Sequence, residues 1–173
     1  MITIISGTNR KNSSSLRLAR YYQHQLAKRG MDAYLFSLEN LPTDLLVSDL
    51  YGARSESFTR ILDQIGESEK IIFIIPEYNG SFPGVLKLFM DACEYPDSFK
   101  GKKVALVGVS GGKYGNIRGV DHFTGVCHYM QMNVLPLKIH IPHIWQELNE
   151  NEHLFKDDTL KFTNLQIDNF LEF

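Results

Sequence analysis

Hydroxyl, amide and guanidinium groups gather in one short segment near the start of the chain, residues 6–15. The segment reads Ser-Gly-Thr-Asn-Arg-Lys-Asn-Ser-Ser-Ser and precedes a helix-like pattern. Because a helix N-terminus offers unpaired N–H groups and a positive dipole end, hydroxyls and a guanidinium there complete a cage for a phosphate dianion. With Gly7 as its single glycine, the segment fits neither a Walker loop nor the dinucleotide fingerprint. It predicts one phosphate rather than a pyrophosphate, although any single serine here could simply cap the helix.

Two later loops are rich in residues that fix or free the backbone. Residues 76–84 read Pro-Glu-Tyr-Asn-Gly-Ser-Phe-Pro-Gly, and residues 110–119 read Ser-Gly-Gly-Lys-Tyr-Gly-Asn-Ile-Arg-Gly. Proline and Asn-Gly specify a tight path, and glycine lets the backbone approach a flat ligand. Each loop could also be an ordinary connector. With the first loop, they predict a phosphate pocket and two walls for a planar group, for which flavin mononucleotide (FMN) is the most economical ligand.

Short apolar runs predict the strands that must position these loops. The runs at 2–5, 70–75 and 104–109 are β-branched and apolar on both faces, which is typical of strands covered by helices on both sides. Weaker runs lie at 33–36 and 134–137, and Pro136 in the latter predicts an edge strand because proline cannot donate to a ladder.

Helical spacing fills the segments between the strands. Apolar residues repeat at helical intervals over 16–26, 58–65, 85–92 and 123–130, and a last helix is expected over 159–171; residues 140–158 show no clear element. The alternation predicts a single α/β domain over 1–173, a flavodoxin-like three-layer α/β/α sandwich with a five-stranded parallel sheet in the order 2-1-3-4-5. All three loops then fall at the carboxyl ends of strands, where such sheets bind ligands.

Composition excludes several other classes of protein. The chain has 173 residues, 43% hydrophobic and 22% charged, with a net charge of -2, so we expect neither nucleic-acid binding nor attachment to a membrane. Two distant cysteines form no disulfide framework and indicate a reducing compartment, so we expect a cytoplasmic protein. His140 and His143 lack further ligands at metal-binding spacing, and we expect no metal site.

The three loops also resemble a known family. Gly7-Thr8-Asn9-Arg10 with Ser13, the run from Pro76 to Ser81, and Ser110-Gly111-Gly112 look like the motifs of the NAD(P)H-dependent FMN reductase family, in the same order and spacing. That family includes quinone, azo-dye and chromate reductases. The resemblance implies non-covalent FMN, NADPH or NADH as co-substrate, hydride transfer to a small acceptor such as a flavin or quinone, and a homodimer or homotetramer.

Matching positions supply the expected cofactor-binding residues. Those of the phosphate loop are Thr8, Arg10, Ser13 and Ser15; those along the ribityl chain and ring are Pro76, Glu77, Tyr78, Asn79 and Gly80; those beside the ring are Ser110, Gly111 and Gly112. Leu88 stands where the family usually has asparagine, and Cys93 where a bulky apolar residue is common. We expect no catalytic acid or base, because the hydride chemistry belongs to the flavin.

Alternative interpretations remain open at this point. The acceptor could be an azo or nitroaromatic compound. A flavodoxin-type electron carrier is a second alternative, although such carriers are usually strongly acidic and this chain is not. A flavin-free signalling module is the third. Trp145 and Tyr114 could stack on a ligand or pack within loops, and we expect Cys93 and Cys127 to be buried packing residues.

Overall fold

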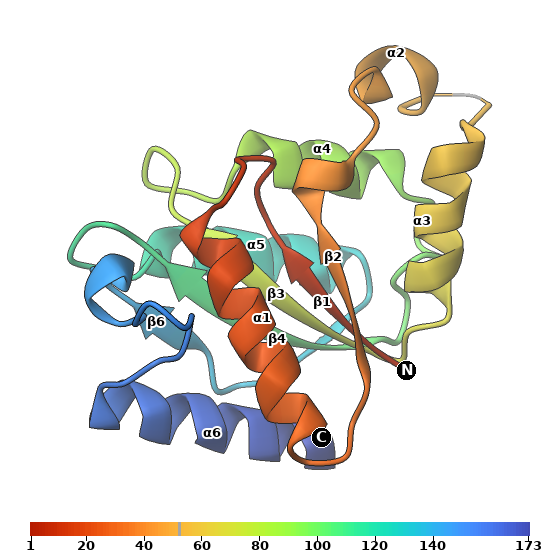
Figure 1. Ribbon diagram of the computed structural model, residues 1–173. Coiled ribbons are helices and arrows are strands. Elements are labelled where there is room, and N and C mark those ends of the chain that lie inside the picture. Colours follow the sequence, from red (N-terminus) through yellow and green to blue (C-terminus); the bar gives the residue numbers. More distant parts are fainter. Residues whose placement is uncertain (52) are drawn as a thin grey trace.

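Helices cover both faces of one parallel sheet (Figure 1). The computed structural model describes residues 1–51 and 53–173. The strands are β1 (Ile2–Ser6), β2 (Ala33–Ser37), β3 (Lys70–Pro76), β4 (Lys103–Val109), β5 (Asn133–Val134) and β6 (Ile139–Ile141). The helices are α1 (Ser14–Ala27), α2 (Leu45–Ser48), α3 (Glu56–Gly66), α4 (Gly84–Ala92), α5 (Ile117–Tyr129) and α6 (Asp157–Glu172), with 3₁₀ turns η1 (Leu38–Asn40) and η2 (Ile144–Gln146).

The sheet has the predicted flavodoxin-like order. Its strands run β2-β1-β3-β4-β5, all pairs are parallel, and β6 also pairs with β4. The β3–β4 ladder runs from Lys70 opposite Lys103 to Pro76 opposite Val109, so the second and third loops leave the sheet side by side. The first loop leaves β1 between β2 and β3, which is the switch point of the sheet.

The edge of the sheet differs from the prediction. We expected one fifth strand over 134–137, but the chain forms β5 at 133–134 and β6 at 139–141, and both pair with β4. Pro136 lies in the gap between them, where its missing N–H breaks the ladder. Among the residues that the structure describes, the sheet therefore has six strands, and β6 falls partly in the segment where we saw no clear element.

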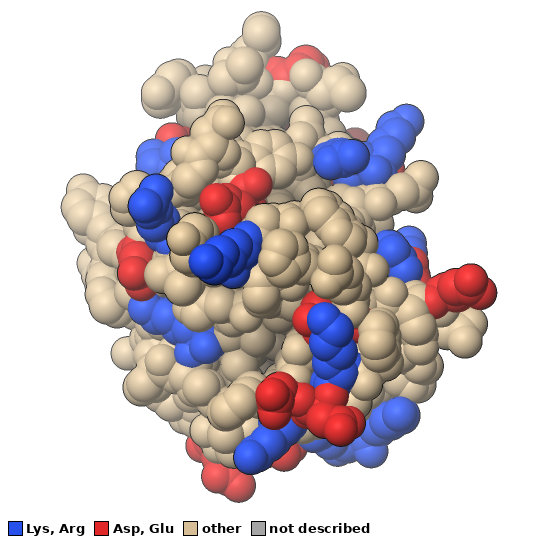
Figure 2. Space-filling model, turned by 90° about the vertical axis from the view of Figure 1, so that its left-hand side faces the viewer, with Lys and Arg blue, Asp and Glu red and all other residues tan. Residues whose placement is uncertain are grey.

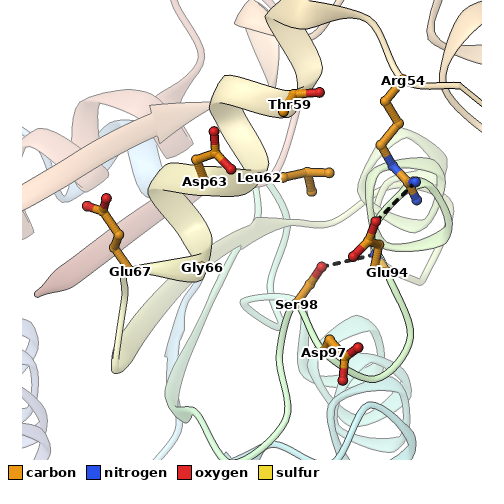
Figure 3. A pocket seen from close by; sticks show the side chains of 9 residues that line it. All are labelled: Arg54, Thr59, Leu62, Asp63, Gly66, Glu67, Glu94, Asp97 and Ser98. Carbon is orange, nitrogen blue, oxygen red and sulfur yellow. Dashed lines mark hydrogen bonds and ion pairs between the residues drawn. The ribbon is translucent and has the colours of Figure 1, made fainter.

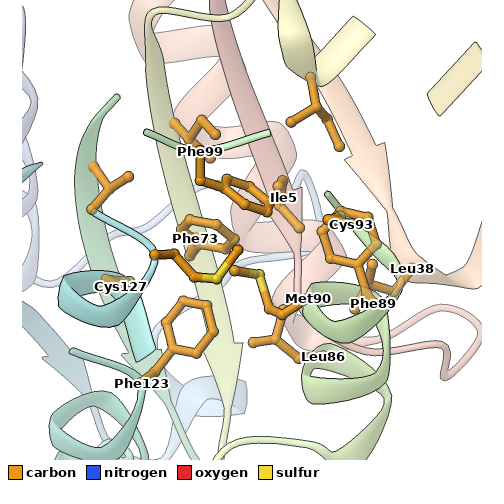
Figure 4. Packing of buried hydrophobic residues seen from close by; sticks show 14 of the residues in the cluster. Ile5, Leu38, Phe73, Leu86, Phe89, Met90, Cys93, Phe99, Phe123 and Cys127 are labelled. Atoms are coloured by element: carbon orange, nitrogen blue, oxygen red, sulfur yellow. The ribbon is translucent and has the colours of Figure 1, made fainter. Parts of the chain in front are cut away.

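Two apolar clusters hold the layers together. One face of the sheet packs against α3, α4 and α5 (Figure 4). In this cluster the ring centroids of Phe73 and Phe123 lie 4.9 Å apart. The other face packs against α1 and α6. Cys93 and Cys127 are free thiols buried in the first cluster, which confirms that they are packing residues. Leu88 is partly buried and packs against the same cluster.

None of the helices in residues 1–51 and 53–173 has the length and apolar character that a membrane span requires.

Candidate functional site

The three loops meet at the carboxyl end of the sheet around a cavity of about 440 Å³. This volume lies in the range of small-molecule and cofactor sites. Nine of the twelve predicted cofactor-binding residues line the cavity: Thr8, Arg10, Ser13, Ser15, Pro76, Glu77, Tyr78, Ser110 and Gly111. Asn79, Gly80 and Gly112 do not line it. Residues far apart in the sequence thus form one site, as the topology requires.

The first loop presents the start of α1 to the cavity. Ser13 has extended backbone and caps the helix, its Oγ accepting a hydrogen bond from the Leu16 N–H at 3.1 Å. The Ser13 and Ser15 hydroxyls lie 3.0 Å apart, and both residues are buried while lining the cavity. The end predicted for the phosphate therefore combines two hydroxyls with the positive end of a 14-residue helix.

A side-chain hydrogen bond ties the first loop to the second. The Thr8 Oγ1 and Tyr78 Oη atoms lie 2.9 Å apart, and Thr8 Oγ1 also accepts a 3.3 Å hydrogen bond from the Arg10 N–H. Within residues 1–51 and 53–173, no carboxylate forms an ion pair with the Arg10 guanidinium. Arg10 is exposed at the cavity rim, so its charge is available to an anionic ligand.

The second loop is a tight two-residue turn, as its Asn-Gly dipeptide predicts. Tyr78 and Ser81 exchange backbone hydrogen bonds of 2.9 and 3.0 Å. Asn79 and Gly80 between them have φ values of 52° and 75°, the left-handed conformation that such hairpin turns need. These two residues shape the turn, whereas Pro76, Glu77 and Tyr78 provide its lining of the cavity.

The third loop is braced by Ser110. Its Oγ donates to the Gly112 carbonyl at 2.8 Å and accepts from the Gly115 N–H at 2.9 Å. Its N–H donates to the Ile141 carbonyl of β6 at 3.0 Å, which anchors the loop to the sheet edge. Gly112 therefore contributes by accepting the Ser110 hydrogen bond that shapes the loop, while Ser110 and Gly111 line the cavity.

A fourth segment, which the sequence analysis did not assign to the site, completes the cavity. Ile144 and Trp145 of η2 line it, and the Trp145 indole packs on Gly111 so closely that a Cβ atom there would overlap the ring. Only glycine accommodates this contact. Trp145 is nevertheless 63% exposed, so part of the ring is open to solvent. The cavity consequently has an aromatic ring in its wall in addition to its hydroxyls.

Two histidines considered as metal ligands instead support the third loop. His140 Nδ1 lies 3.3 Å from the Gly115 carbonyl oxygen, and His143 Nδ1 lies 3.2 Å from that of Gly111. Burial lowers the pKa of His140, which favours a neutral ring that can donate to a carbonyl. In the described part of the chain, no group of three or more metal-binding side chains is present.

A larger groove of about 780 Å³ lies elsewhere, between α3 and residues 94–98 (Figure 3). Its lining includes four acidic residues: Asp63, Glu67, Glu94 and Asp97. Arg54 is already engaged there, donating to the Ala92 carbonyl at 2.9 Å and pairing with Glu94 at 3.3 Å. Four carboxylates repel a phosphate, so the smaller cavity at the sheet end fits a mononucleotide and the larger groove does not.

The residues of the smaller cavity fit FMN on chemical grounds. The first loop lines the cavity with hydroxyls, the start of α1 and two cations, Arg10 and Lys11, and the other segments line it with backbone, Tyr78 and Trp145. A phosphate and a flat aromatic ring need these two kinds of surface. On the same face of the molecule, basic and acidic side chains are interspersed (Figure 2).

Comparison with known proteins also points to an FMN enzyme. The profile of the family described as NADPH-dependent FMN reductase matches residues 1–146. A 2-hydroxy-1,4-benzoquinone reductase from Burkholderia sp. is 27% identical over 98% of this chain and 93% of its own length. A quinone reductase from Pseudomonas putida is 32% identical over 70% of this chain and 65% of that protein.

A solved structure extends the likeness to the whole fold. It is FerB, a flavoenzyme NAD(P)H:(acceptor) oxidoreductase from Paracoccus denitrificans, with a TM-score of 0.82 and 25% identity. The match covers 99% of this chain and 94% of that one. Topology, convergent loops and sequence profile agree, and the chain belongs to the NADPH-dependent FMN reductase family.

Proposed function

We propose that this protein is an FMN-containing reductase that uses NADPH or NADH to reduce a small quinone. The observation that carries the proposal is the convergence of the three family loops on one cavity, with hydroxyls and cations from the first loop and an aromatic side chain, Trp145, from η2. The names of the quinone reductase relatives support the choice of acceptor.

The phosphate of FMN would be held by the first loop. Ser13 and Ser15 would offer hydroxyls, the start of α1 its N–H groups, and Arg10 a charge-assisted hydrogen bond. Thr8, fixed by its contact with Tyr78, would hold the loop and the turn together. Because Arg10 lies at the rim and the serines lie deeper, the serines would provide the fixed part of the site and Arg10 the adaptable part.

Residues 76–78 and 110–111 would orient the flavin ring. Bound FMN supplies hydride chemistry, accepting two electrons from a nicotinamide and delivering them to an acceptor. The chain itself would keep one side of the ring covered, with Trp145 and the Ser110–Gly111 backbone excluding water there. Backbone N–H groups of the glycine-rich loop would stabilise negative charge near the ring. No acid or base from the chain is needed for this role.

An electron-carrier function is the main competing proposal, and charge argues against it. Docking between one-electron carriers relies on a large surface region of one charge, whereas this chain has a net charge of -2 and interspersed positive and negative side chains (Figure 2).

We further propose a homodimer or homotetramer, in which a neighbouring subunit shields the open flavin face. A cytoplasmic location is consistent with two free, buried thiols.

Turnover tests the proposed function directly. The purified protein, loaded with FMN, is mixed with NADPH or NADH and 1,4-benzoquinone, and nicotinamide oxidation is followed by absorbance. We expect multiple turnovers with saturation in both substrates and the ping-pong pattern of a flavin reductase. Bleaching of the flavin without turnover on any quinone, azo dye or nitroaromatic compound would instead support the electron-carrier proposal. Turnover on azo dyes but not on quinones would show that the acceptor is an azo compound and not a quinone.

A further inference from the structure

A second cavity, of about 140 Å³, adjoins the proposed FMN pocket and shares Glu77 with it. Its other lining residues are Tyr114 from the third loop and Ile117 and Arg118 from the first turn of α5. The inference drawn from this cavity rests on the proposed function and concerns the kind of acceptor that the enzyme takes.

The walls of this cavity are partly apolar although they face solvent. Tyr114 is 63% exposed and Ile117 is 45% exposed. Exposed apolar side chains that are grouped beside a cavity mark a binding surface more often than isolated ones do. Cavities of about 150 Å³ accept a benzene ring, so this cavity has room for a single six-membered ring.

Arg118 gives the same cavity a positive charge. Its side chain is exposed, and no carboxylate within residues 1–51 and 53–173 forms an ion pair with it. The guanidinium lies beside the turn of the second loop: a Cβ atom added to Gly80 would be 4.0 Å from Arg118 Nη1. A guanidinium that lines a cavity can bind a carboxylate through two parallel hydrogen bonds, or the charged oxygen of an enolate.

Two other charged groups affect this assignment. Glu77 also lines the cavity and its carboxylate repels an anion, so a negatively charged ligand must place its charge at Arg118 and away from Glu77. The Lys113 ammonium lies 5.7 Å from the Tyr114 ring centroid and does not line either cavity. Arg118 is therefore the cation positioned to select an anionic ligand.

We propose that this subsite selects quinone acceptors that carry one negative charge, with the charged oxygen bound by Arg118. A suitable probe is 2-hydroxy-1,4-benzoquinone, whose hydroxyl is a vinylogous acid and is ionised at neutral pH. Its reduction adds one hydride and two protons to the anion and gives benzene-1,2,4-triol. The hydride comes from NADPH or NADH, which becomes NADP⁺ or NAD⁺, and the protons come from water.

The test compares an anionic and a neutral quinone of similar size on the FMN-loaded enzyme. The protein is reduced anaerobically and then mixed in a stopped-flow instrument with 2-hydroxy-1,4-benzoquinone or 2-methyl-1,4-benzoquinone. For Arg118→Gln we expect the preference for the anionic quinone, as a ratio of second-order rate constants, to fall at least tenfold, about 1.4 kcal/mol. Arg118→Lys should recover part of the preference. Lys113→Gln removes a charge from the same loop and should leave the ratio unchanged.

Other outcomes would overturn the assignment. An unchanged ratio in Arg118→Gln, or an equal loss of rate with both quinones, would show that Arg118 does not select the charge. Slower flavin reduction by NADPH or NADH with an intact quinone ratio would assign Arg118 to the phosphates of the nicotinamide nucleotide. A parent protein that is reduced by nicotinamide but reoxidised by neither quinone would refute the proposed function itself, whereas equal rates with both quinones would refute only the subsite.

Discussion

Replacing Arg10 by alanine should weaken FMN binding without disturbing the fold. Arg10 lines the cavity, is exposed, and forms no ion pair with a carboxylate in the described part of the chain. The substitution therefore breaks no ion pair within residues 1–51 and 53–173. The Ser13 cap of α1 and the Thr8–Tyr78 hydrogen bond, which hold the loop in place, both remain.

The size of the effect follows from this geometry. A hydrogen bond to a charged group contributes about 1.5–3 kcal/mol, and the exposed position of Arg10 favours the lower half of that range. A loss of about 2 kcal/mol raises the dissociation constant of FMN roughly 30-fold. Ser13, Ser15 and the helix N-terminus still hold the phosphate, so binding should weaken rather than disappear.

Titration of the apoprotein with FMN, followed by flavin fluorescence, measures this difference at low and high salt. Riboflavin lacks the phosphate and should bind the parent and Arg10→Ala equally. Arg20→Ala is the matched control, because Arg20 lies on the exposed side of α1, pairs with Glu152 and does not line the cavity. Unchanged FMN affinity, or an equal loss for riboflavin, would refute the phosphate assignment.

Four further predictions concern the frame of the site and the packing of the core. Gly108→Ala should destabilise the protein by about 1–3 kcal/mol in denaturant unfolding and loosen FMN binding, because its Cβ would overlap the Gly115 carbonyl oxygen; unchanged stability would contradict the packing. Ser13→Ala should cost about 1 kcal/mol as a lost helix cap and should also weaken FMN more than riboflavin. Burial raises the pKa of Cys127 to about 12 and that of Cys93 further, so both thiols should resist alkylation at neutral pH in the native state. Since these pKa values lie above those of the unfolded chain, unfolding free energy should stay level near neutral pH and fall as pH rises above about 9; a rise would contradict the burial.

Local patterns were sufficient to predict the layers and most of the site. The β-branched runs at β1, β3 and β4 are buried on both faces, and the helices between them carry apolar stripes of the right period, so each element agrees with the others. Because parallel strands place their carboxyl ends at one edge, three loops distant in sequence could be assigned to one cavity before any contact was known.

The sequence could not predict features that depend on distant contacts. Ile144 and Trp145 reach the cavity because β6 docks on β4 beyond the break at Pro136, and nothing local in residues 140–158 signals that pairing. The contact of Trp145 with Gly111 joins positions 34 residues apart and has no periodic signature. The helix α2, which projects from the top of the molecule in Figure 1, was not predicted either, because its four residues are too few to show a helical period.

Flavin binding by the apoprotein tests the central claim most directly, namely that the three converging loops form an FMN site. The protein is stripped of any ligand, incubated with an equimolar mixture of FMN, FAD and riboflavin, freed of unbound flavin by gel filtration, and denatured so that the released flavin can be identified by chromatography. The hydroxyl-rich loop with its single glycine predicts one FMN per chain and no retained FAD. Recovery of FAD, or of no flavin at all, would contradict the account.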